Sequence, residues 1–153
     1  MKHSKSGLFL MEMIVCLLFF ALSASVCAQM FAKSHKISHT AINENHAVIA
    51  VSNIAECFYA EFGDTGSISE KFFDTSSSVA DDGTLRVYYN EAFEPASPSA
   101  GEPPYYAELK IIGTNENMRE GVISFFSRSE KNGTVTIEPV YSLDVNVNIP
   151  NRK

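Results

Sequence analysis

The chain has 153 residues, enough for one domain and a membrane anchor. Its formal charge is −6, and no stretch combines clustered Lys and Arg with aromatic residues. Direct binding to nucleic acid is therefore not predicted, because neutralising phosphates needs basic clusters.

The first feature along the chain is a hydrophobic run from Leu8 to Ala32. As a helix this run would be about 37 Å long, which exceeds the bilayer core of about 30 Å. Glu12 lies inside it, where a carboxylate is unfavourable by about 2.5–3.5 kcal/mol, and this predicts a functional role. If the chain were cut after Gly7, the new amino group on Leu8 would lie one helical turn from Glu12, in the same chain or in a neighbouring copy.

Residues 5–15 resemble the cleavage and methylation signature of type IV pilins and of the pseudopilins of type II secretion and DNA uptake. That signature has a short basic leader ending in Gly, an apolar residue next, and Glu five places after the Gly. The resemblance implies that prepilin peptidase cleaves between Gly7 and Leu8, that Leu8 is N-methylated, and that Glu12 forms the assembly salt bridge with a Leu8 amine. It also implies other pilin or pseudopilin subunits as partners.

The chain departs from the family pattern at four positions. Leu8 replaces the usual Phe, and Phe9 stands where Thr is common. Ala21 and Gln29 occupy positions where many family members have a helix-breaking Gly or Pro, which argues against local melting of this helix in a filament.

Two alternatives explain the same N-terminus. A secretory signal peptide would use Lys2, His3 and Lys5 as its basic region and be removed after Ala28. The product would be a secreted binding module with ligand-contacting loops at 64–83 and 93–104. The other alternative is an uncleaved, single-pass membrane-anchored domain. Lysines flank both ends of the run, so charge alone does not orient it, although the polar remainder favours an exported body.

After Ala32 the apolar residues thin to a stripe at spacings of three, four and seven, which predicts an amphipathic helix that ends near Gly63. The stripe consists of Ile37, Ala41, Val48, Val51, Ala55, Phe58 and Phe62, with Ile54 on its flank. We expect one long helix from Leu8 to about Phe62.

The sequence after this helix predicts a polar loop over 64–83, with one turn of structure near Phe72 and Phe73. An antiparallel sheet is predicted to follow it. Alternating strands are expected from Leu85, from Tyr105, over Val122–Phe126 and over 143–149, with Val135 and Ile137 between them. On the first of these strands Leu85, Val87 and Tyr89 would point to one side and Arg86, Tyr88 and Asn90 to the other. The inward rows of the second and last strands would be Tyr105, Ala107, Leu109 and Ile111, and Leu143, Val145, Val147 and Ile149. Expected turns are 95–104, 113–120 and 131–134, the last with the hairpin dipeptide Asn-Gly, and Pro139 is expected to break the pattern.

The fold class predicted is therefore α+β, with a long N-terminal helix packed on an antiparallel meander of four or five strands. Its first half would be transmembrane and its second half amphipathic. The expected organisation is a leader (1–7), a transmembrane and assembly helix that provides the membrane contact (8–32), an amphipathic helix (33–62) and an extracytoplasmic loop and sheet (63–153). The expected location is the bacterial cytoplasmic membrane, or a filament after assembly.

No cofactor or metal is predicted. His35, His39 and His46 are expected to lie on a solvated or subunit-facing helix surface, opposite the Val48 stripe. Asp81-Asp82-Gly83 and Asp64-Thr65-Gly66 lack the further ligands of a calcium loop and are interpreted as turns. Asn132 matches a glycosylation acceptor, which the hairpin turn explains without modification. No catalytic motif is present, and an enzyme is not expected.

The three cysteines, Cys16, Cys27 and Cys57, all fall on the predicted helix, too far apart along it to pair within the chain.

Overall fold

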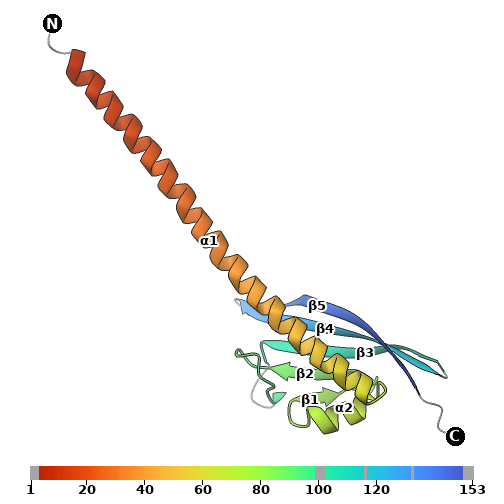
Figure 1. The fold of residues 1–153 in the computed structure, drawn as a ribbon. Coiled ribbons are helices and arrows are strands. Elements are labelled where there is room, and N and C mark those ends of the chain that lie inside the picture. The colour runs from red at the N-terminus through yellow and green to blue at the C-terminus, as the bar shows by residue number, and fades with distance from the viewer. Residues whose placement is uncertain (1–3, 99–102, 116, 132, 150–153) are drawn as a thin grey trace. The chain divides into compact units, whose positions relative to one another are not determined.

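The computed structural model describes residues 4–98, 103–115, 117–131 and 133–149. The chain divides into two compact units, residues 1–42 and residues 43–153, called here the N-terminal unit and the C-terminal unit. Helix α1 (Ser4–Ala60) begins in the first and ends in the second (Figure 1). The prediction of one long N-terminal helix is confirmed, including its unbroken course through Ala21 and Gln29.

In the N-terminal unit the apolar side chains of α1 are exposed along its whole length. The helix contains a segment long and apolar enough to cross a membrane, with a mean hydropathy of 2.3. None of that segment is buried within the described chain. The N-terminal unit therefore provides one candidate membrane span.

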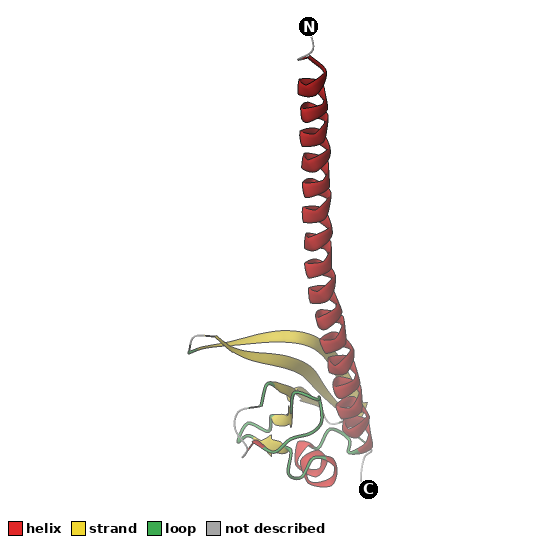
Figure 2. Ribbon diagram, turned by 90° about the vertical axis from the view of Figure 1, so that its left-hand side faces the viewer, coloured by secondary structure: helices red, strands yellow, loops and turns green. Residues whose placement is uncertain are grey.

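In the C-terminal unit the described residues form a five-stranded antiparallel sheet in which each strand pairs with the next along the chain (Figure 1). Figure 2 shows the strands of this unit in yellow and its helices in red. The strands are β1 (Ser77–Val79), β2 (Leu85–Tyr89), β3 (Tyr105–Asn115), β4 (Met118–Lys131) and β5 (Thr134–Asn148). The α+β meander is thus confirmed.

The core lies between the last four turns of α1 and one face of the sheet. The buried positions on α1 are Ala47, Ala50, Val51, Ile54, Ala55 and Phe58, and those on the strands include Leu85, Val87, Ala107, Leu109, Ile123, Phe125 and Val145. The inward rows predicted for β2, β3 and β5 match this core. The contact stabilises the unit by removing apolar side chains from water.

The predicted stripe on α1 is confirmed at Val51, Ala55 and Phe58, and it is wrong at its start and at its end. Ile37 and Val48 are 58% and 39% exposed, Ala41 is exposed, and Ile54 is central to the contact. The buried stripe starts at Ala47 and includes Ala50, two small residues that the predicted stripe did not contain. Phe62 lies beyond the helix end and is exposed.

The end of α1 is a tight turn with a left-handed backbone. Phe62 has a φ of 51° and Gly63 a φ of 75°, and the Gly63 N–H donates to the Phe58 carbonyl at 2.8 Å. The Nη1 of Arg119 donates to the Phe62 carbonyl at 3.3 Å. These bonds satisfy carbonyls that a helix end leaves without partners.

The predicted loop over 64–83 is instead mostly regular. Helix α2 (Thr65–Phe72) and strand β1 occupy it, and Ile68 of α2 is fully buried. Burial of this side chain holds the short helix in place. The rest of the segment is polar, so the sequence shows no helical periodicity of apolar residues there.

Two strand boundaries also differ from the prediction. The turn predicted at 113–120 is a pair of strands: β3 continues to Asn115 through an irregularity between Ile111 and Gly113, and β4 begins at Met118. Pro139 does not end β5, because β5 is an edge strand and a register shift opposite Phe125 and Phe126 accommodates it. The predicted hairpin at 131–134 is confirmed by the pairing of Lys131 with Thr134, and Gly133 has a φ of 76°.

Candidate functional site at the N-terminal end of α1

The three residues assigned to processing and assembly lie in the first turns of α1. Gly7, Leu8 and Glu12 are all exposed, and Leu8 is 69% exposed. Because the helix is continuous from Ser4, Leu8 and Glu12 are at positions i and i+4 on one face. A Cβ built on Gly7 would meet no atom within 4 Å, so no described side chain covers this position.

Glu12 is the one charged residue between Leu8 and Ala32. No ion pair or hydrogen bond to it is present among the side chains that the structure describes. By contrast, the Ser23 hydroxyl donates to the Phe19 carbonyl at 2.9 Å, which satisfies it within the helix. The Glu12 carboxylate is therefore the charged group of this segment, and in an apolar surrounding it needs a partner from outside the described contacts.

The apolar surface around Glu12 is large and uncovered. Its exposed side chains are Phe9, Leu10, Met11, Met13, Ile14, Val15, Leu17, Leu18, Phe19, Phe20, Leu22, Val26, Met30 and Phe31. A patch of this extent marks contact with lipid or with another protein. The structure thus places an unpaired carboxylate within a surface that water disfavours.

The histidines do not form a metal site. His35 and His39 have ring centroids 4.7 Å apart, and no group of three or more potential ligands is present among the described residues. His46 corrects the prediction of a solvated surface, because it is half-buried and stacks on Phe93 at 4.1 Å with the rings 5° from parallel.

The acidic turns carry local hydrogen bonds. The Oδ1 of Asp82 accepts the Thr84 N–H at 3.0 Å, which lowers the pKa of the Asp82 carboxyl. The Oδ2 of Asp64 accepts the Ser67 hydroxyl at 2.6 Å, and Asp64 precedes the first residue of α2. Asp81-Asp82-Gly83 is a turn, as predicted, whereas Asp64-Thr65-Gly66 forms the start of α2, which corrects the prediction of a turn there. Asn132, the glycosylation candidate, lies outside the described residues.

All three cysteines are free thiols, in agreement with the helix-spacing argument. Cys57 is half-buried. Burial, and then the neighbouring Glu56 carboxylate, raise the pKa of the Cys57 thiol. It therefore has the character of a structural and unreactive cysteine.

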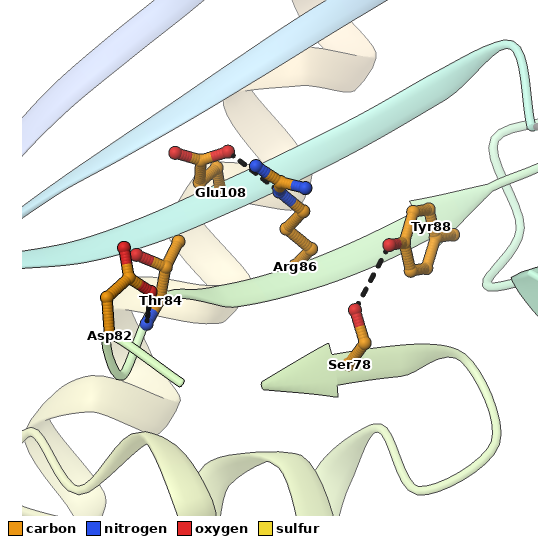
Figure 3. A network of polar contacts seen from close by, with 6 residues as sticks. All are labelled: Ser78, Asp82, Thr84, Arg86, Tyr88 and Glu108. Carbon is orange, nitrogen blue, oxygen red and sulfur yellow. Dashed lines mark hydrogen bonds and ion pairs between the residues drawn. The ribbon is translucent and has the colours of Figure 1, made fainter. Parts of the chain in front are cut away.

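A cavity of about 340 Å³ lies in the C-terminal unit, on the sheet face opposite the core, and was not predicted from the sequence. Arg86, Tyr88, Tyr106 and Arg128 are among its lining residues. The strand alternation predicted Arg86 and Tyr88 on the outer face of the sheet. The recurrence of aromatic residues at outer positions was the one sequence signal that could have indicated this cavity. Figure 3 shows the Arg86–Glu108 ion pair and the Ser78–Tyr88 hydrogen bond on this face.

Comparison with protein-family models, with curated proteins and with solved structures finds no match to this chain.

Proposed function

We propose that the protein is a structural subunit of a type IV pilus-like filament, a secretion pseudopilus or a DNA-uptake apparatus. Prepilin peptidase would cut between Gly7 and Leu8, and Leu8 would then be N-methylated. The departures at Leu8, Phe9, Ala21 and Gln29 favour a minor pilin or pseudopilin. The proposal rests on the motif at 5–15 together with the unpaired carboxylate on an uncovered apolar helix.

Glu12 supplies the charge that aligns subunits. Cleavage creates a positive amine on Leu8, and a Glu12 carboxylate one turn away on the same helical face is within reach of it. The amine of a neighbouring copy can take the same place, so each carboxylate is matched when two helices are in the correct register. In an apolar surrounding this match is strongly favoured, because an uncompensated charge there is costly.

The exposed apolar side chains of residues 10–31 provide the lateral packing surface. They contact lipid while the subunit is held in the membrane, and sister helices after extraction into the filament. Since α1 is unbroken at Ala21 and Gln29, a filament of this chain packs continuous helices at these positions. The sheet of the C-terminal unit then remains available on the outside.

The test is Glu12→Gln, with Glu56→Gln as the matched control. Both substitutions remove one negative charge from an exposed position on α1 and leave side-chain size unchanged. Removing one partner of a buried ion pair costs about 3–5 kcal/mol, so incorporation of Glu12→Gln into filaments should fall about a hundredfold or more. Cleavage and the folding of the C-terminal unit should be unchanged.

Incorporation is measured by quantitative immunoblotting of sheared filaments against the membrane pool. Normal incorporation of Glu12→Gln, or equal defects in both variants, rejects the role assigned to Glu12.

A further inference from the structure

The part of α1 that follows its apolar run carries positive charges only. Lys33 and Lys36 lie there, and no Asp or Glu occurs between Glu12 and Glu44. All side chains from 33 to 39 are exposed. The two lysines therefore give this segment a positive formal charge in a chain whose formal charge is −6.

Two histidines lie on the same side of the helix as the two lysines. Lys33 and Lys36 are three residues apart, as are Lys36 and His39, and such pairs are neighbours on a helix surface. His35 and His39 are four residues apart, and their ring centroids are separated by 4.7 Å. From the helical repeat, the four side chains occupy about 160° of the helix circumference. Lys33, His35, Lys36 and His39 are called here the basic patch.

The charge of the basic patch has no partner among the residues that the structure describes. The two ion pairs found among them lie in the C-terminal unit, and neither includes Lys33 or Lys36. Glu44 is the next acidic residue after the patch and lies about 12 Å beyond Lys36 along the helix axis. The Thr40 hydroxyl donates to the Lys36 carbonyl at 3.1 Å and is therefore satisfied within the helix. The two ammonium groups are thus available to an anion from outside the described contacts.

The patch lies at the depth of the lipid headgroups when α1 spans a bilayer. The run from Leu8 to Ala32 is about 37 Å long as a helix and exceeds a core of about 30 Å by about 7 Å. Lys33 then lies within about 8 Å of the core boundary, in a headgroup layer that is about 5–8 Å deep on each side. Lys36 lies nearly one turn further out. Because Cα–Cβ bonds in a helix tilt toward its N-terminus, both lysine side chains lean back toward the bilayer.

We propose that the basic patch binds the headgroups of anionic phospholipids where α1 leaves the membrane. The lysine ammonium groups match the negative charge of these lipids, and each lysine near an anionic surface favours binding by about fivefold. The imidazoles of His35 and His39 add N–H donors for phosphate oxygens. Acidic side chains of a second copy are the other possible occupant, but the patch directly continues the candidate membrane span, which favours lipid. The proposal rests on that span and is independent of cleavage at Gly7 and of filament assembly.

The test places the full-length, isotope-labelled protein in nanodiscs of phosphatidylcholine that contain a rising fraction of phosphatidylglycerol with the same acyl chains. The two headgroups share the phosphate and differ in net charge. The backbone amide NMR signals of residues 33–39 should shift with the phosphatidylglycerol fraction. The shifts should largely disappear in about 1 M salt, where the Debye length falls to about 3 Å. Signals that do not respond to phosphatidylglycerol overturn the proposal, and so does failure of the protein to enter nanodiscs.

Two matched double variants locate the site. Lys33→Gln with Lys36→Gln and Lys110→Gln with Lys131→Gln each remove two positive charges from exposed side chains, but the second pair lies on the sheet. The first variant should raise the phosphatidylglycerol fraction at half-maximal shift at least about fivefold, or abolish the shift. Gln is as good a helix former as Lys, so α1 should stay intact. The sheet variant should change that fraction by less than about twofold. Equal effects of the two variants contradict a site at the patch.

Three further measurements separate this proposal from its alternatives. Glu12→Gln should leave the lipid-dependent shifts unchanged, so that this test and the filament test fail independently. Inorganic phosphate at the same phosphate concentration should produce no comparable shift of residues 33–39. Equal shifts with inorganic phosphate would indicate a site for a free anion. Shifts that follow the protein concentration and not the lipid would indicate a second copy. Either of these two results overturns the proposal.

Discussion

At the scale of single residues, the turn that ends α1 depends on Gly63. Its φ is 75°, and a Cβ built there would lie 2.8 Å from Cε2 of Phe58 and 2.9 Å from Cδ of Arg119. Gly83 has a similar φ of 80°, but a Cβ there meets no atom within 4 Å. The pair therefore separates backbone strain from steric overlap.

We expect Gly83→Ala to lower the free energy of unfolding by about 1–2 kcal/mol, the cost of a left-handed backbone for an L-residue. Gly63→Ala should lower the free energy of unfolding by about 1–3 kcal/mol more than Gly83→Ala does, because the added methyl overlaps the Phe58 ring. Urea unfolding of the full-length protein in micelles measures both. Tyrosine fluorescence reports on the C-terminal unit alone, because all six tyrosines lie in it. Equal losses would contradict the packing of Phe58 against this turn.

The Cys57 thiol is expected to make the stability of the C-terminal unit depend on pH. Burial raises the pKa of its thiol in the folded state, whereas an unfolded thiol titrates near about 8.5. The stabilising effect of the neutral thiol is thus complete below about pH 8.5 and is lost as pH rises through the higher folded-state pKa.

In a Cys16→Ser, Cys27→Ser background, Cys57 should be alkylated more slowly in the folded protein than in urea at pH 8.5. Its unfolding free energy should also fall more steeply above that pH than that of a further Cys57→Ser variant. Identical alkylation rates in the two states would show that the thiol is not shielded.

At the scale of elements, the second half of α1 is anchored by one face only. Ile54 is fully buried against the sheet, whereas Ile49 on the same helix is 49% exposed. Ile54→Ala should lower the free energy of unfolding by about 2–5 kcal/mol. Ile49→Ala should lower it by less than about 1 kcal/mol. If urea unfolding gives the two variants the same stability, the observed contact face of α1 is wrong.

The helices and strands that were predicted incorrectly from the sequence differ from the structure for separate reasons. The helix stripe was predicted to begin at Ile37 but begins at Ala47, because Ala47 and Ala50 face the sheet and Val48 does not. Helix α2 was missed because it buries one large side chain, Ile68, within a polar segment. The outer parts of β4 and β5 pass beyond the core and are exposed on both faces, so alternation disappears there.

At the scale of the whole molecule, the sequence predicted the helix, the meander and the inward rows of β2 and β3, because one covered face imposes a clear alternation. The proposed processing site rests on the motif at 5–15, so it can be predicted from the sequence alone. The sheet-face cavity could not be located in this way, because it depends on the register of four strands.

The most direct measurement of the central claim is the intact mass and N-terminal sequence of the protein purified from its native host. The proposed processing predicts a chain that begins at N-methylated Leu8 and lacks residues 1–7. A chain that begins at Met1 would indicate an uncleaved anchor, and one that begins at Gln29 would indicate a secreted module. Either result would contradict the pairing of Glu12 with a Leu8 amine.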